Sequence, residues 1–272
     1  MTEITDEEFN RIRDFIKIKL GINLSDVKKT LLQSRLNSIL NEKGFDNFTL
    51  YFDDLLQDKS GDALVQFVNR VTTNHTYFMR EKDHFDYLRD TALPYIYENH
   101  SQNRDLRLWC AACSTGEEPY TLEMIIQDFF RDKPDRWDTQ ILATDISTNV
   151  LLKAAQGAYS EENLKDLPNR WIHDYFITYG DKHKQVRNEI KKLIIFRKFN
   201  LMEEKFPFKK PFHIIFCRNV MIYFDSDTRD QLISKFYDAT VTGGFLFIGH
   251  SESLNYKTTK YKYIKPAVYR KE

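Results

Sequence analysis

The sequence has few cysteines and no long apolar run. Its three cysteines are Cys110, Cys113 and Cys217, too few for a disulfide framework, so free thiols in a reducing compartment are expected. No stretch approaches the ~20 apolar residues needed to cross a bilayer, and residues 1–4 lack the basic and apolar regions of a signal peptide. We therefore expect a cytoplasmic protein.

The sequence also has no excess charge of either sign, because 40 Lys and Arg residues balance 40 Asp and Glu residues. A positive field over the whole molecule, which dominates affinity for nucleic acids, is thus absent. We expect no nucleic-acid partner, and any charged partner must meet a local patch.

What is present is an ordinary globular composition, with 42% apolar and 29% charged residues in a chain of 272. This length favours one large α/β domain with a smaller companion. Apolar residues recur at helical spacing through residues 1–72. Helices are predicted from Phe9 to Leu20 with Gly21 as the stop, from Ser25 or Asp26 to Lys43, from Thr49 onward, and around 64–68. A helical domain without strands is expected at 1–72.

After residue 106, short apolar runs alternate with helical stretches, which predicts βα units around a mainly parallel sheet. The expected strands are 106–111, 140–144, 193–198, 213–217 and 244–248, followed by a hairpin of 260–264 and 267–270. The alternation is interrupted at about 157–189, which we interpret as an inserted subdomain. The second domain is therefore placed at 73–272.

Ligands of open α/β sheets bind where the parallel strands end. The first expected strand leads into small residues at 112, 114 and 116, followed by Glu117 and Glu118. Two carboxylates at the start of a helix disfavour binding of a pyrophosphate there, because the negative charges repel each other. They suit a cationic ligand such as S-adenosylmethionine, since opposite charges ~4 Å apart gain several kcal/mol in a partly dry site. Alternatively, the two acidic residues only stabilise the start of a helix.

Other strand ends also carry polar residues. Asp145 is placed to accept the hydroxyls of a ribose, although a helix N-cap is an alternative. Asn200 and Leu201 follow the third strand, where they suit an adenine or form an ordinary turn. Residues 217–224 bring an amide, a guanidinium and a phenol to the end of the fourth strand. The polar run 72–80 lies between the two domains, where ligand pockets are frequent, and its alternative role is that of a linker.

Five of these segments together closely resemble the CheR chemoreceptor methyltransferases. They are 73–80, 113–120, 143–145, 217–224 and 249–252. The resemblance implies an all-α domain followed by a Rossmann-like class I methyltransferase domain that carries a small β-subdomain insertion. S-adenosylmethionine would lie in the cleft between the two domains.

The resemblance also implies roles for individual residues. Matching positions assign Asn74, Thr76 and Arg80 to the cofactor, Glu117 or Glu118 to its methionine end, Asp145 to the ribose, Asn200 and Leu201 to the adenine, and Asn219 and Val220 to the adjoining cofactor surface. Arg80 and Tyr223 match family residues near the transferable methyl group and are the expected catalytic residues.

The implied reaction methylates glutamate side chains of chemotaxis receptors, producing glutamyl methyl esters and S-adenosylhomocysteine for chemotactic adaptation. A glutamate carboxylate, with a reference pKa of ~4.3, is already ionised at neutral pH. No general base is required, so the task of the protein is to position the reacting groups.

The family's receptors present an acidic helical methylation region, for which a basic surface is expected. From 11 to 43 the chain has eight basic against three acidic residues. Lys28, Lys29 and Arg35, on the expected second helix, are the candidate receptor contacts, with a solvated charged face as the alternative. Relatives that dock on a C-terminal receptor pentapeptide have a longer glycine-rich loop than 179–185, so such docking is not expected here.

Other functions fit the sequence less well. Cys110 and Cys113 have the spacing of a redox motif, but Cys110 is expected within a strand. No metal is expected, because no second Cys/His pair stands at zinc-ligand spacing. Adenine-specific methyltransferases carry Asp/Asn-Pro-Pro-Tyr/Phe after the fourth strand, where this chain has Arg-Asn-Val-Met at 218–221. A scaffold that binds the cofactor and docks on receptors without turnover remains an alternative.

Overall fold

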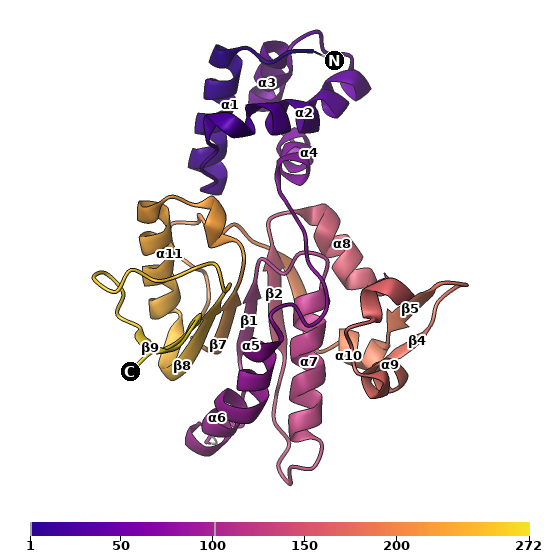
Figure 1. The fold of residues 1–272 in the computed structure, drawn as a ribbon, viewed down its shortest axis with the longest axis vertical. Coiled ribbons are helices and arrows are strands. Elements are labelled where there is room, and N and C mark those ends of the chain that lie inside the picture. Colours follow the sequence, from indigo (N-terminus) through magenta and orange to yellow (C-terminus); the bar gives the residue numbers. More distant parts are fainter. Residues whose placement is uncertain (1, 101) are drawn as a thin grey trace.

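A computed structural model describes residues 2–100 and 102–272, with a helical part at one end of the molecule and a sheet-containing part at the other (Figure 1). The helical part consists of α1 (Asp6–Leu20), the 3₁₀ helix η1 (Asp26–Lys28), α2 (Lys29–Lys43), α3 (Phe48–Gln57) and α4 (Asp62–Val71). Its apolar residues form a core of their own, which includes Phe9, Ile12, Ile16 and Leu20 of α1.

Local signals set the ends of these helices. Thr5 and Glu8 form a reciprocal capping box at the start of α1, and Gly21 ends it at φ +71°. The expected end of the second helix is confirmed, with Gly44 as its left-handed cap. Its expected start is wrong by a few residues, because η1 comes first and Ser25 makes no side-chain cap bond. Lys28 therefore lies in this 3₁₀ turn and not in α2.

Within the described residues, seven strands form one sheet in the order β6-β2-β1-β7-β8-β10-β9. The five strands predicted from the apolar runs are confirmed as β1 (Leu108–Ala111), β2 (Ile141–Asp145), β6 (Ile194–Lys198), β7 (Phe212–Cys217) and β8 (Thr240–Ile248). They run parallel. The predicted hairpin is formed by β9 (Lys262–Lys265) and β10 (Val268–Arg270), and β10 also pairs antiparallel with β8. The parallel strands thus have the doubly wound order, with its switch point between β1 and β7.

Helices cover both faces of the sheet. One face packs against α5 (Lys82–Tyr87), a π turn (Leu88–Ala92), α6 (Leu93–Asn99) and α7 (Glu117–Phe130). The other face packs against α11 (Ser226–Asp238) through a core centred on Trp109. Cys110 and Trp109 are adjacent in β1 but belong to these opposite cores, as the two-residue repeat of a strand requires. The helices at 82–99 had no sequence prediction.

The interruption predicted at about 157–189 is a separate small sheet. After α8 (Thr148–Gln156), strands β3 (Ala158–Ser160), β5 (His183–Val186) and β4 (Phe176–Thr178) pair antiparallel in that spatial order. The remaining elements are η3 (Glu161–Leu164), α9 (Asn169–Tyr175) and α10 (Asn188–Lys191). This subdomain projects from the side of the main sheet near α7 and α8 (Figure 1).

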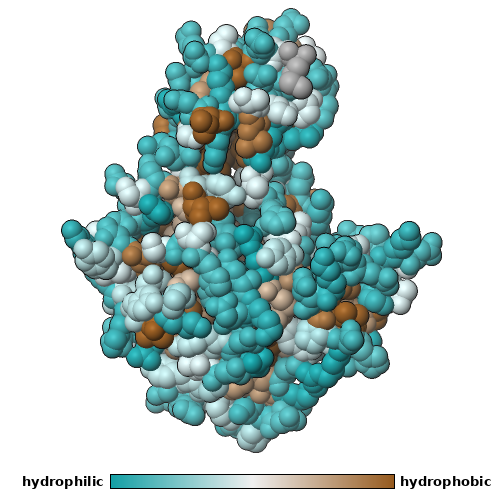
Figure 2. All heavy atoms as spheres, in the orientation of Figure 1, coloured by the Kyte–Doolittle hydropathy of each residue, from teal (hydrophilic) through white to brown (hydrophobic). Residues whose placement is uncertain are grey.

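The helical part contacts the sheet-containing part near the carboxyl ends of the parallel strands. The backbone N–H of Asn23 donates to the Tyr223 carbonyl at 2.7 Å, and Lys17 pairs with Asp225 at 2.9 Å. Most of the face in Figure 2 is hydrophilic, with small apolar patches on the helical part and just below it. None of the described helices combines the length and apolar character required to cross a membrane.

Candidate functional site

A cavity lies between the helical part and the carboxyl ends of the parallel strands. Its empty volume is about 1250 Å³, including open solvent at its mouth. Its walls come from η1 and α2, from the segment after α4, and from the loops that follow β1, β2, β6 and β7. The predicted residues that line it are Lys28, Arg35, Asn74, Thr76, Arg80, Glu118, Asp145, Asn200, Leu201, Asn219, Val220 and Tyr223.

The loop after β1 is held in an unusual backbone conformation. Ala112, Ser114 and Gly116 all have positive φ values, of 65°, 48° and 98°. A side chain at Gly116 would meet the Tyr159 hydroxyl at 2.8 Å, so only glycine fits there. Ser114 donates its hydroxyl to the Asn74 carbonyl at 3.0 Å, which ties this loop to the segment after α4.

The structure distinguishes the two carboxylates at the start of α7. Glu117 is buried away from the cavity and accepts a hydrogen bond from Thr115 Oγ1 at 2.7 Å. Burial raises the pKa of Glu117 above its usual range. Glu118 lines the cavity and pairs with Arg218, whose Nη1 lies 2.6 Å from its Oε2. Of the two residues, only Glu118 is placed to meet a ligand in the cavity.

Asp145 ends β2 with its carboxylate fixed by backbone N–H groups. Ser114 N donates to Oδ2 and Ser147 N donates to Oδ1, each at 2.9 Å. The N-cap of α8 is Ser147, so the alternative that made Asp145 the cap is wrong. Burial raises the pKa of Asp145 despite these hydrogen bonds. A carboxylate has about four acceptor positions, so acceptor capacity remains for hydroxyl groups in the cavity.

The side chain of Asn200 is partly engaged within the protein. Its Nδ2 donates to the Lys19 carbonyl at 2.8 Å, and its Oδ1 accepts from Met202 N at 3.0 Å. Asn200 thus joins the end of α1 to the loop after β6. Neighbouring Leu201 is buried and adds an apolar surface to the cavity wall.

A buried network fixes the loop after β7. Arg218 lies between Glu118 and Glu81, whose Oε2 is 3.0 Å from Nη2. Burial opposes its charge, but the two carboxylates raise the pKa of Arg218. Asn219, at φ 58°, donates Nδ2 to Glu81 Oε1 at 3.0 Å and its backbone N–H to Glu252 Oε2 at 3.1 Å.

Sequence reasoning assigned no role to Glu81 or Glu252. Glu81 follows Arg80 and is a single acidic residue in no recognisable motif. Its partners come from the loops after β7 and β8, far away in the sequence. Burial works against its charge, yet the Asn219 hydrogen bond and the Arg218 charge lower the pKa of Glu81. Glu252 is one residue of the 249–252 segment that carried the family resemblance.

Arg80 and Tyr223 both line the cavity, from the segment after α4 and from the loop after β7. Nη1 of Arg80 donates to the His75 carbonyl at 2.9 Å, and its guanidinium lies 5.9 Å from the Tyr77 ring centroid. Lys28 Nζ lies 5.5 Å from the Tyr223 ring centroid. The helical part therefore contributes a cation next to the predicted catalytic tyrosine.

The three predicted receptor contacts occupy different environments. Lys28 and Arg35 line the cavity, whereas Lys29 is outside it and pairs with Asp6 at 2.7 Å. Arg35 donates to the Val71 carbonyl and, at 2.8 Å, to Thr73 Oγ1. Arg35 thus holds the segment after α4, whereas Lys28 lies beside the Tyr223 ring in the cavity.

The cysteines are buried thiols. Cys110 lies in β1, where its Sγ donates to Glu118 Oε1 at 3.2 Å. Cys110, Cys113 and Cys217 are free, and burial raises the pKa of each well above its usual range. Thiols that stay protonated are poor nucleophiles, so a redox role for the Cys110–Cys113 pair is disfavoured.

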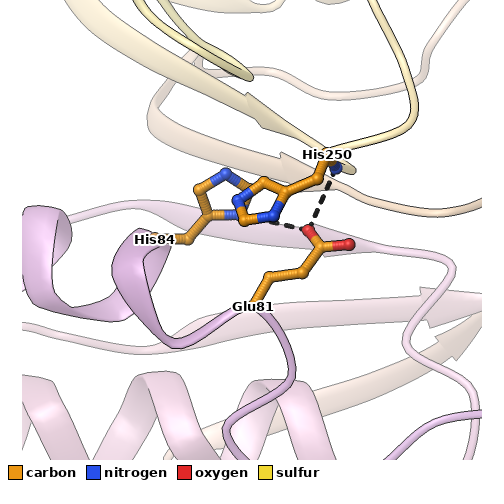
Figure 3. A group of neighbouring side chains, drawn as sticks. All are labelled: Glu81, His84 and His250. Carbon is orange, nitrogen blue, oxygen red and sulfur yellow. Dashed lines mark hydrogen bonds and ion pairs between the residues drawn. The ribbon is translucent and has the colours of Figure 1, made fainter.

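Among the described residues, one group has the donor atoms of a metal site. Glu81, His84 and His250 each offer a ligand atom, and these atoms all lie within 4.8 Å of one another (Figure 3). Burial and the nearby Arg218 charge lower the pKa of His84 to about 3, so its imidazole is neutral. The group lies behind the cavity wall, since none of the three residues lines the cavity itself.

Two family models match the chain. Residues 7–72 match the all-alpha domain of CheR methyltransferases, and residues 74–269 match their SAM binding domain. The chain is 43% identical over 270 residues to a chemotaxis protein methyltransferase of Borreliella burgdorferi, an alignment that covers 98% of this chain and 95% of the relative. It is 35% identical over 275 residues to a chemotaxis protein methyltransferase of Escherichia coli, covering 99% and 93%.

A solved structure, the glycopeptide N-methyltransferase MtfA complexed with S-adenosylmethionine, shares 13% identity with this chain. It matches at a TM-score of 0.33, covering 58% of this chain and 49% of that one. This likeness is too weak to support a conclusion.

Proposed function

Because the chain belongs to the CheR methyltransferase family, we propose that it methylates glutamate side chains of chemotaxis receptors. The products are glutamyl methyl esters and S-adenosylhomocysteine. The observation that carries this proposal is the cavity itself, in which Glu118 and Asp145 stand at adjacent strand ends and Tyr223 faces Lys28 of the helical part. Carboxylates, an aromatic ring and basic residues are what a cationic cofactor and an acidic substrate require.

The residues of the cavity fit S-adenosylmethionine, which supplies the methyl group when bound. The buried Asp145 carboxylate has acceptor positions left for the two ribose hydroxyls. We assign the methionine end to Glu118 in preference to Glu117, because Glu118 lines the cavity and Glu117 does not. Asn74, Thr76, Arg80, Asn200, Leu201, Asn219 and Val220 complete the proposed cofactor-binding residues.

Arg80 and Tyr223 are the proposed catalytic residues, and their role is to orient the substrate. A guanidinium has five N–H donors, of which Arg80 uses one on the His75 carbonyl, so the others are available to a glutamate carboxylate. The carboxylate needs no deprotonation at neutral pH. Alignment alone contributes up to ~7–11 kcal/mol to such a reaction.

The proposed partner surface is basic. Lys28, Lys29 and Arg35 are the residues we assign to the acidic helical methylation region of the receptor. The short loop of the inserted subdomain, with Gly180 as its one glycine, does not favour docking on a receptor pentapeptide. We place the reaction in the cytoplasm, with which the three free cysteines accord. Residues 1–72 and 73–272 are our proposed division into domains.

The test is transfer of a labelled methyl group from S-adenosylmethionine to receptor-containing membranes, followed by mild alkali. Base-labile label on the receptor is expected, since a carboxyl methyl ester hydrolyses under these conditions. Label on nucleic acid would contradict the proposal. Tight cofactor binding without any turnover would instead support the scaffold alternative.

A further inference from the structure

A polar group outside the cavity is not explained by methyl transfer. Glu81 precedes α5, His84 lies within α5, and His250 follows β8, so residues from two distant segments meet (Figure 3). We propose that Glu81, His84 and His250 bind a divalent transition-metal ion of the zinc type.

The donor set is one that such ions prefer. Two imidazoles and one carboxylate are the protein ligands of many zinc and non-haem iron sites. Ligands ~2.1 Å from a tetrahedral zinc ion lie ~3.4 Å apart. His84 Nδ1 and Glu81 Oε2 are separated by 3.5 Å, which already matches this spacing. The third donor, from His250, lies within 4.8 Å of both.

His84 provides the second, independent observation. It is 0% exposed, and neither of its ring nitrogens has a hydrogen-bond partner among the described residues. Buried polar groups without partners are rare, and a bound ion is one established explanation. Its ring stands 4.5 Å from the ring of His250.

Charged side chains of both signs surround the group. Glu81, Glu118 and Asp83 are acidic, whereas Arg218 is the basic residue paired with the first two. A divalent ion would balance the resulting excess of two negative charges. Asp83 Oδ1 lies 3.1 Å from His250 Nε2, a position suited to a carboxylate that orients a ligating histidine. The half-exposed His250 side chain gives the ion a path from solvent.

The sequence offered no sign of this site. Zinc motifs are recognised by closely spaced pairs of ligands, whereas here the loop after β8 brings His250 to α5. Glu81 also holds Arg218 and Asn219, which line the cavity. Binding of an ion at Glu81 would therefore affect the positions of these two residues in the cavity wall.

The experiment titrates the full chain, freed of metal by chelator, with Co²⁺ and follows its visible absorption, then displaces Co²⁺ with Zn²⁺. One saturable equivalent is expected. His250→Gln and Glu81→Gln should each weaken binding on the order of 10–100-fold or more. His250 is the preferred site for the change, because its partly exposed side chain makes misfolding less of a concern than at the buried His84.

His173→Gln is the matched control, because His173 also lies beside an aspartate, Asp174, at 3.0 Å, but is 89% exposed. It should bind Co²⁺ as the unaltered protein does. Equal Co²⁺ binding by His250→Gln and the unaltered protein would overturn the proposal. So would the absence of saturable binding, or binding lost only in His100→Gln, whose ring lies 5.1 Å from that of His213.

Discussion

Arg218 Nη1 lies 2.6 Å from Oε2 of Glu118, and both side chains are largely buried. This ion pair joins the loop after β7 to the first turn of α7, across the switch point of the sheet. Glu81 binds the same guanidinium from the segment before α5. Three segments that form the cavity wall are thus held by one cation.

The first prediction concerns the stability that this cation provides. Arg218→Ala leaves Glu81 and Glu118 facing each other without a counter-charge, and breaking a buried ion network in this way costs about 3–5 kcal/mol. The free energy of unfolding, from denaturant titration, measures the loss. Arg136→Ala, at an exposed arginine, should change it by less than ~0.5 kcal/mol. Similar values for the two variants would argue against the network.

The second prediction concerns cofactor affinity. Asp145→Asn removes the charge that we assign to the ribose hydroxyls, and a hydrogen bond to a charged group contributes about 1.5–3 kcal/mol. The dissociation constant for S-adenosylmethionine, measured by calorimetry, should rise about 10- to 100-fold. Asp166→Asn, at an exposed position, is the control and should bind normally. An unchanged affinity in Asp145→Asn would show that this residue does not bind the cofactor.

The third prediction separates the proposed receptor contacts. Lys28→Glu places a negative charge beside Tyr223 and in the cavity, whereas Lys29→Glu alters a residue that already pairs with Asp6. Receptor methylation by Lys28→Glu should fall about tenfold or more, a loss of ~1.4 kcal/mol. Lys29→Glu should have a smaller effect. The measurement is the rate of label transfer to receptor membranes. Equal losses in the two variants would mean that the receptor contacts a wider basic surface.

The fourth prediction concerns the loop after β1. Gly116→Ala places a methyl group 2.8 Å from the Tyr159 hydroxyl and 2.9 Å from Ala154 Cβ. Overpacking of this kind costs about 1–3 kcal/mol. Gly180→Ala is a close match, because its φ is also positive, at +68°, but nothing lies within 4 Å. The difference in unfolding free energy isolates the clash, and no difference would show that the loop relaxes freely.

The fifth prediction concerns pH. Burial raises the pKa of Glu123 from 4.5 to about 8, so between these values the folded state holds a proton that the unfolded state has lost. Stability therefore falls as pH rises through this window, by up to ~1.4 kcal/mol per pH unit. Glu123→Gln should flatten the dependence between about pH 5 and 8, as followed by denaturation at each pH. Glu98→Gln, at an exposed position, should retain the pH dependence of stability. A steep dependence that persists in Glu123→Gln would mean that another group causes it.

Local patterns were enough to predict most of the secondary structure. Apolar spacing and Gly21 located α1, and the five apolar runs located the parallel strands, because periodicity and caps act within a few residues. The start of α2 was misplaced, since helix ends depend on small differences between competing turns. The resemblance of short segments to the CheR family then identified the cofactor and the class of reaction.

The sequence by itself thus determined the fold class, the family and the residues that would gather at the strand ends. Only the tertiary structure decided which of them face the cavity: Glu118 and not Glu117, Lys28 and not Lys29. It alone joined Glu81 to Arg218 and to His84. The physical reason is that ion pairs and buried contacts join residues that are far apart in the chain. A local sequence pattern does not indicate which distant residue will be the partner.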